Sequence, residues 1–262
     1  MKKVILSILC LAGSYRLAAQ EHPNSLKVRV GSLSGRMLDQ QASPLLYHTR
    51  ATQVTLDFLH MSKRARFSVA ISPAIGTTLP ERFGERAYGD DFYQYKVHSS
   101  FYAADVDVSY IRQLGSRSRK VKFFLGGKLQ NSLQIADKVA NFYWATNVAA
   151  LQAQFQTEYT HNRHHLTAGV STPVLAAVSR HIHANFPKSA DESNFIAFFK
   201  QGTRFTAPHR LRMLQANAHY QFMLSQRMSA GVDYGIRWMR YPSPRPVQSI
   251  YQSVSVHTAF NF

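Results

Sequence analysis

The chain has 262 residues, of which 45% are hydrophobic and 17% charged, and its formal net charge is +17. This length suits one all-β domain or two smaller domains. Beyond residue 20 no apolar run is long enough for a membrane-spanning helix, and the lack of cysteine there excludes a disulfide framework and a thiolate metal site.

The first 20 residues have the three parts of a secretory signal peptide. Two lysines at the start are followed by an apolar run over residues 4–11 and then by small residues up to Ala19. The apolar run is too short to span a bilayer. We therefore predict a signal peptide over residues 1–20, cleaved near Ala19, and one exported domain over residues 21–262.

Export changes how the charge is interpreted. Removal of Lys2, Lys3 and Arg16 with the signal peptide lowers the formal net charge from +17 to +14. A basic balance often indicates nucleic-acid binding, but an exported chain rarely meets nucleic acid. The expected partners of this charge are therefore anionic lipid or glycan, and no nucleic acid.

Apolar and polar residues alternate in a series of stretches along the exported domain. Because successive side chains of a strand point to opposite faces, each stretch predicts a strand with one apolar face. In chain order, strands are predicted at 53–58, 66–72, 102–110, 120–130, 149–159, 165–174, 214–222, 229–238 and 248–262. A weaker alternation over residues 26–37 predicts a tenth strand.

This pattern fits either a soluble sandwich or a membrane barrel. Several stretches exceed the usual globular strand of about 5–6 residues, which favours the barrel. The connections also alternate in length, as in barrels with short periplasmic turns and longer external loops. Tight turns are predicted near residues 62–63, 115–118, 161–162 and 225–226, and longer loops at 76–95, 135–143, 180–208 and 241–247.

The last predicted strand has four large apolar residues on one face, Val254, Val256, Phe260 and Phe262, and polar side chains on the other. A strand of this kind that ends on phenylalanine resembles the C-terminal signal by which bacterial outer-membrane barrels are recognised for insertion. We therefore predict that these four residues face lipid and form a barrel-assembly signal.

The end of the signal peptide, the strand series and the closing Asn261-Phe262 together resemble the small uncharacterised outer-membrane β-barrels of Bacteroidota. The resemblance implies an all-β fold, a transmembrane antiparallel β-barrel of about ten strands in the bacterial outer membrane. It provides no catalytic residue and no cofactor, so it indicates a location and a fold without an activity.

The face of the strands that would point into the barrel collects charged residues of both signs. They are Asp57, Arg66, Asp105, Asp107, Lys120, Lys122, Asp233 and Arg237. Because buried charges need partners, we predict a paired network inside the barrel. A barrel of roughly eight strands is filled by side chains, whereas one of sixteen or more leaves a channel. Ten strands therefore predict a nearly full or narrowly wet interior, with a narrow transport channel as the alternative.

Three patterns keep an enzyme, either a surface protease or a lipid-modifying enzyme, as a further alternative. Two predicted loops hold the residue types of a protease site: Asp90, Asp91, His181, His183 and Asp191. Ser255 and His257 share a strand face, as an acyl-transfer pair would, but no acid is assigned to them. His161, His164 and His165 are dense enough for a metal site, but no second cluster accompanies them. We predict no metal, no cofactor and no catalysis.

The longest predicted loop mixes aromatic rings with cations: Phe195, Phe198, Phe199, Lys200 and Arg204. Functional residues often lie on loops held by a rigid scaffold. These side chains predict contacts with lipopolysaccharide, a glycan or another envelope protein, unless the loop folds inward as a lid and its rings pack. The favoured function is a structural or interaction component that displays external loops.

Overall fold

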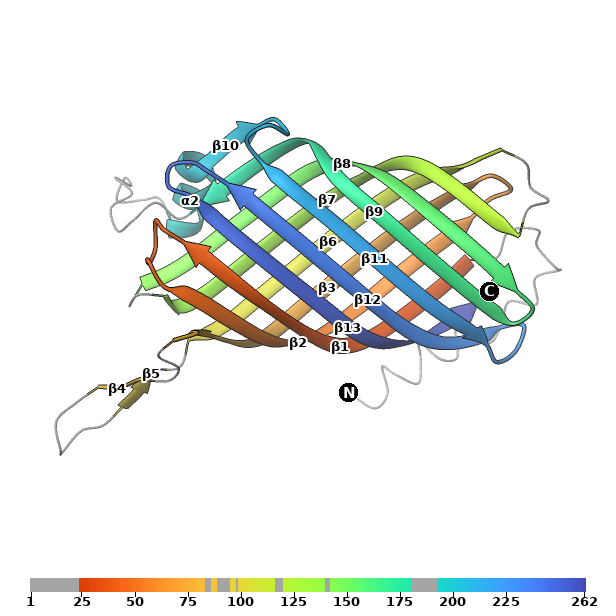
Figure 1. Ribbon diagram of the computed structural model, residues 1–262, viewed down its shortest axis with the longest axis horizontal. Coiled ribbons are helices and arrows are strands. Elements are labelled where there is room, and N and C mark those ends of the chain that lie inside the picture. Colours follow the sequence, from red (N-terminus) through yellow and green to blue (C-terminus); the bar gives the residue numbers. More distant parts are fainter. Residues whose placement is uncertain are drawn as a thin grey trace.

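The computed structural model describes residues 24–82, 86–88, 95–97, 99–115, 120–139, 142–180 and 193–262. Ten long antiparallel strands form the wall of a closed barrel (Figure 1). They are β1 (Asn24–Asp39), β2 (Leu46–Met61), β3 (Ala65–Pro80), β6 (Ser100–Leu114), β7 (Val121–Val139), β8 (Phe142–His161), β9 (His164–Arg180), β11 (Arg212–Met223), β12 (Met228–Tyr241) and β13 (Val247–Asn261). The predicted fold class is confirmed. The predicted signal peptide, residues 1–20, lies outside the described residues.

The first and last strands close the wall. β1 pairs with β13 from Ser25 opposite Asn261 to Asp39 opposite Val247, and on its other side β1 pairs with β2. The weak alternation at residues 26–37 therefore belongs to a complete wall strand. Closure removes the open edges that a sheet would otherwise expose to lipid.

Short and long connections lie at opposite ends of the barrel (Figure 1). The connections β2–β3, β6–β7, β8–β9 and β11–β12 are short and lie beside the C-terminus, at the end that we call the inner end. The tightest of them consists of Asn162 and Arg163, and Asn162 adopts a left-handed conformation with φ 52°. The opposite, outer end carries the longer connections, apart from the short one between β7 and β8, so the inner end corresponds to the periplasmic side.

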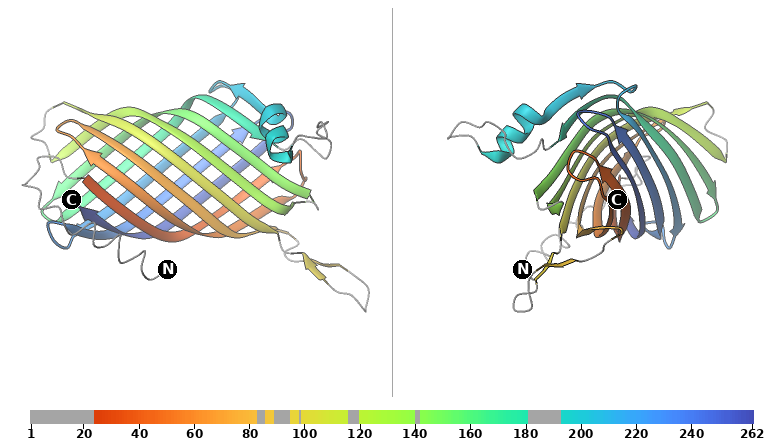
Figure 2. Two further views of the ribbon diagram at one scale, coloured as in Figure 1. Left: turned by 180° about the vertical axis from the view of Figure 1, so that it is seen from behind. Right: turned by 60° about the vertical axis from the view of Figure 1, so that its left-hand side comes forward.

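Three smaller elements extend from the outer end: the hairpin of β4 (Arg86–Tyr88) with β5 (Tyr95–Val97), the helix α2 (Asn194–Gly202) and the strand β10 (Thr203–Thr206). The Ser193 side chain caps α2 by accepting a hydrogen bond from the amide of Ile196. β10 pairs with the outer part of β9, whereas β11 pairs with its inner part. As Figure 2 shows, α2 and β10 lie beside the rim of the barrel and not across its mouth. No helix in the described ranges is long and apolar enough to cross a membrane.

One predicted loop is wrong, and the loop predicted at 76–95 begins too early because β3 continues to Pro80. Residues 135–143 were expected to form a long external connection, but β7 continues to Val139 and β8 begins at Phe142. Ala136, Val139 and Trp144 are buried in this region and pack into the barrel interior. Apolar side chains on both faces remove the period-two contrast, so the alternation ends in the sequence before the strands end in the structure.

The outer surface of the wall is apolar, as predicted. Large side chains that point outward remain exposed along every wall strand, including Leu56, Ile71, Val106, Leu125, Leu151, Val170, Leu214, Val232, Val254 and Val256. Exposed aromatic rings flank this band, with Tyr110, Tyr159, Tyr220, Phe260 and Phe262 toward the inner end and Tyr102 and Trp238 toward the outer end. An exposed apolar band between two aromatic girdles is the surface of a membrane barrel.

Candidate functional site

The inner part of the lumen contains a polar cavity of about 730 Å³. Its lining reaches from Asn261, beside the inner turns, to Leu33 and Tyr251 about halfway along the barrel. Side chains from all ten wall strands contribute to it. The cavity therefore lies toward the inner end, and we call it the vestibule. Within the part of the chain that the structure describes, it is the candidate functional site.

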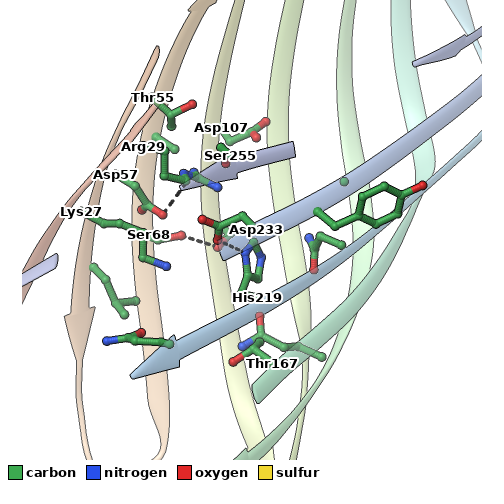
Figure 3. A pocket seen from close by; sticks show the side chains of 18 of the residues that line it. Lys27, Arg29, Thr55, Asp57, Ser68, Asp107, Thr167, His219, Asp233 and Ser255 are labelled. Atoms are coloured by element: carbon green, nitrogen blue, oxygen red, sulfur yellow. Dashed lines mark hydrogen bonds and ion pairs between the residues drawn. The ribbon is translucent and has the colours of Figure 1, made fainter. Parts of the chain in front are cut away.

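Asp233 on β12 is the centre of one side of this vestibule (Figure 3). Its carboxylate is bonded by Nδ1 of His219, and Nδ1 of His257 lies 2.5 Å from its other oxygen. Lys27 interacts electrostatically with both Asp233 and Asp57. Arg29 pairs with Asp57 at 3.4 Å, as the dashed line in Figure 3 marks. Two carboxylates are thus compensated by cationic or proton-donating neighbours, as buried charges require.

Strand register explains how this group assembles. His219 lies opposite Asp233 on β11, and Ser255 lies opposite it on β13. His257 lies opposite Gly231, and a Cβ atom at Gly231 would stand 2.7 Å from Cε1 of the His257 ring. The missing side chain at position 231 therefore leaves the space in which His257 turns toward Asp233.

We expect Gly231→Ala to destabilise the barrel by about 1–3 kcal/mol, the usual range for overpacking. The added methyl group would overlap the backbone carbonyl oxygen of Tyr220 and crowd His257. Gly127→Ala is the matched control, because a Cβ there has only the Gln152 carbonyl oxygen nearby, at 3.7 Å. Unfolding in urea after reconstitution into vesicles measures both variants, and equal stability of the two would contradict the packing argument.

Two further ion pairs cross the lumen. Arg237 donates to both carboxylate oxygens of Asp105, at 3.2 and 3.3 Å, and to Ser132 at 3.0 Å. Arg66 makes a two-pronged contact with Glu158. The guanidinium fork suits such contacts because it presents parallel donors to a carboxylate. These pairs join strands that are not neighbours in the wall and so brace it across the interior.

The structure places most of the predicted network in the vestibule. Asp57, Arg66, Asp105, Asp107, Lys122, Asp233 and Arg237 all line the cavity. Lys120 does not, because β7 begins one residue later and Lys120 lies exposed on the bend before it. The network also includes Lys27, Arg29, Lys128, Glu158 and His219, which the same inward alternation identifies.

The outer half of the lumen is packed with apolar side chains, which the sequence analysis did not identify. Leu33, Met37, Tyr47, Phe101, Trp144 and Tyr251 form one buried cluster together with several alanines and Val139. A second cluster contains Val148, Val178, Leu211, Met213, Met239, Tyr241 and Val247. An extension of the alternation upstream of residue 53 would have found Tyr47 and Ala51 on the inward face.

A buried ion pair locks the outer end. One oxygen of Asp39 accepts from Nη2 of Arg180 at 2.5 Å and the other from Nε1 of Trp144 at 2.8 Å. The second guanidinium nitrogen of Arg180 donates to the backbone oxygens of Ser243 and Arg245, each at 2.7 Å. This lock ties together β1, β8, β9 and the β12–β13 loop. Sequence reasoning missed it because both residues lie at the ends of strands.

Among the described residues, the side chains named for the enzyme alternatives are not arranged as an active site would require. His257 is fully buried, its Nδ1 is bonded to Asp233, and its Nε2 has no hydrogen-bond partner in the described part of the chain. It therefore does not contact Ser255 as an acyl-transfer base would. The loop residues Asp90, Asp91, His181, His183 and Asp191 lie outside the described ranges.

The three clustered histidines do not share one face of the wall, since His161 lies opposite His164 in the ladder of β8 and β9 while His165 points the other way. Nδ1 of His164 lies 2.8 Å from the Tyr220 hydroxyl on the outer surface, whereas His165 lines the cavity. Among the described residues, no group of three or more His, Cys, Asp or Glu side chains is arranged to hold a metal ion.

The predicted loop contacts divide between two environments. In α2, Phe195 is 65% exposed, whereas Phe198 is buried and stacks edge-on with Phe199 at 4.9 Å. Lys200 and Arg204 are exposed on α2 and β10. Beside them, Phe205 is 81% exposed, a residue that the sequence analysis did not single out.

Comparison with known proteins identifies the fold alone. No protein-family model matches the chain, and no curated protein matches its sequence. The crystal structure of the outer membrane protease OmpT from Escherichia coli is similar with a TM-score of 0.61 and 8% identity, over 95% of this chain and 99% of that chain. Neisserial surface protein A is similar with a TM-score of 0.41 and 8% identity, over 90% of this chain and 97% of that one. Ail of Yersinia pestis is similar with a TM-score of 0.32 and 6% identity, over 91% of this chain and 99% of that chain. The chain therefore has the fold of a bacterial outer-membrane β-barrel, in agreement with its predicted location.

Proposed function

We propose that this protein is a non-conducting, non-catalytic barrel of the outer membrane, a structural or interaction component that contacts its partners through the outer rim. We further propose, from the signal peptide ending and the closing Asn261-Phe262, that it belongs with the small barrels of Bacteroidota. The expected partners are outer-membrane lipid, lipopolysaccharide, a glycan or another envelope protein.

The observation that supports this function is the packed outer half of the lumen. The vestibule ends at Leu33 and Tyr251, and both residues also belong to the apolar cluster beyond it. The rings of Tyr251 and Phe101 stack with centroids 6.4 Å apart across this boundary. Hydrated ions do not cross a layer of packed apolar side chains, because burial of a charge there is very costly.

The closed lumen leaves the rim as the surface that an external partner can contact. Phe195 and Ile196 of α2 and Phe205 of β10 are exposed apolar side chains at the outer end. They project from elements that lie outside the mouth (Figure 2). Rings of this kind, held by a rigid scaffold and accompanied by cations, suit binding to an amphipathic or glycan surface.

We expect the wild-type protein to show no steady single-channel conductance in a planar bilayer. The double variant Phe101→Ala/Tyr251→Ala should conduct, because it removes the stacked rings between the vestibule and the outer end. Both proteins are first checked for folding by the difference in gel mobility between unheated and boiled samples.

The matched control is Tyr102→Ala/Val254→Ala. Tyr102 follows Phe101 on β6, Val254 lies near Tyr251 on β13, and both side chains are exposed on the lipid face. This control should remain closed. Steady conductance by the wild-type protein would refute the proposed function and would favour the transport-channel alternative instead.

A further inference from the structure

Two arginines at the outer end form an unusual pair. Arg212 on β11 and Arg240 on β12 lie directly opposite each other in the ladder, and both are exposed. The adjacent Met213 and Met239 are buried in the lumen, so the two arginines point outward. Two like charges directly opposite on neighbouring strands repel each other and destabilise the pairing.

No carboxylate in the described ranges compensates this pair. Glu81 is engaged by Arg36 at 2.7 Å, and Asp39 is engaged by Arg180 inside the lumen. Asp137 accepts a hydrogen bond from the amide of Ser100 at 2.6 Å. The described carboxylates of the outer end therefore have other contacts, and the arginine pair is a concentrated positive charge on the outer surface.

The depth of the pair follows from its neighbours. One step further into the outward row, Leu214 lies opposite Trp238, and both are exposed on the lipid-facing surface. Tryptophan is enriched where the hydrocarbon meets the headgroups. The arginines therefore lie just beyond the apolar band, at the level where lipid headgroups carry their phosphates.

We propose that Arg212 and Arg240 form a binding site for a phosphate group of a lipid in the outer leaflet, whose acyl chains lie against Leu214 and Trp238. Guanidinium groups bind phosphate through two parallel hydrogen bonds and remain charged under all physiological conditions. A phosphate bound between the two arginines would also relieve their mutual repulsion. This site is on the outer surface and is independent of the closure of the lumen.

The test uses the folded full-length protein in a neutral detergent, with bisphosphorylated lipid A as the probe and native mass spectrometry as the readout. We expect Arg212→Ala and Arg240→Ala each to weaken binding about fivefold and the double variant roughly thirtyfold, because an arginine near an anionic surface contributes about the corresponding free energy. Arg212→Lys/Arg240→Lys should fall between, since it keeps the charge but loses the planar fork.

The controls separate a defined site from general attraction. Arg36→Ala removes an outer-end arginine that already has a carboxylate partner, and Arg227→Ala removes an exposed arginine at the inner end. Both should bind lipid A within about twofold of the wild type, a change smaller than the loss of one arginine contact. Lipid A without its phosphates should bind no better to the wild type than to the double variant.

Three results would overturn the proposal. They are wild-type affinity in the double alanine variant, an equal loss in Arg36→Ala, or displacement of lipid A by millimolar inorganic phosphate. The last result would assign the site to free phosphate. If the alanine variant fails to fold, wild-type affinity in the double lysine variant would overturn the bidentate site.

Discussion

Asp39→Ala is expected to destabilise the barrel by about 3–5 kcal/mol, the usual cost of breaking a buried ion pair from one side. The side chains of Arg180 and Asp39 are only 4% and 5% exposed. The substitution would leave the Arg180 guanidinium buried without its carboxylate and would remove the acceptor of the Trp144 indole. Urea unfolding in lipid vesicles, followed by tryptophan fluorescence, measures the change in the free energy of unfolding.

The double variant Asp39→Ala/Arg180→Met tests the cause. It removes the unpaired guanidinium of Arg180 as well as the carboxylate of Asp39, so it should be more stable than Asp39→Ala alone. A double variant that is less stable than the single one would mean that the contacts of Arg180 with the backbone oxygens of Ser243 and Arg245 matter more than the ion pair.

Val106→Arg should be the second most damaging change, with a cost of about 2–4 kcal/mol for an arginine on the lipid face near the middle of the bilayer. Val106 is 39% exposed on the outward face in the middle of β6. Val232→Arg should cost less, because Val232 lies opposite Tyr220, closer to the inner interface. Folding yield and unfolding free energy in vesicles measure both variants.

The neighbouring Asp105→Asn is the inward control. It weakens the pair with Arg237, but Arg237 keeps its bond to Ser132 and lines the polar vestibule. Its cost should therefore remain below that of Val106→Arg. If Val106→Arg folds like the wild type while Asp105→Asn fails, the assignment of the two faces of β6 is inverted.

The lipid-facing half of each strand was predictable because water and lipid impose a simple alternation. Residues such as Leu56, Val170 and Val254 were identified by period two alone and point outward in the structure. The first strand gave a weaker signal because Gly31 and Gly35 dilute its pattern. Gly35 is required by a residue distant in the sequence, because a Cβ at this position would overlap the ring of Tyr251.

The interior was less predictable because its contacts cross the lumen. Arg237 pairs with Asp105, and Arg66 with Glu158, between strands that never share a ladder. Alternation identifies these side chains as inward, but it does not determine which cation meets which carboxylate. The apolar outer cluster was missed for a different reason: where Ala136 and Trp144 face inward, apolar residues occur on both faces of the strand and the alternation weakens.

The seam between β1 and β13 has a consequence for the order of folding. Its ladder joins Ser25 to Asn261, residues from nearly opposite ends of the sequence, whereas every other ladder of the wall joins two wall strands that follow one another along the chain. Loop-closure entropy opposes contacts of large sequence separation until the intervening hairpins have formed. The hairpins then carry β1 back to β13, so the seam becomes the last ladder to form, and the cylinder acquires its closed topology only in that final step.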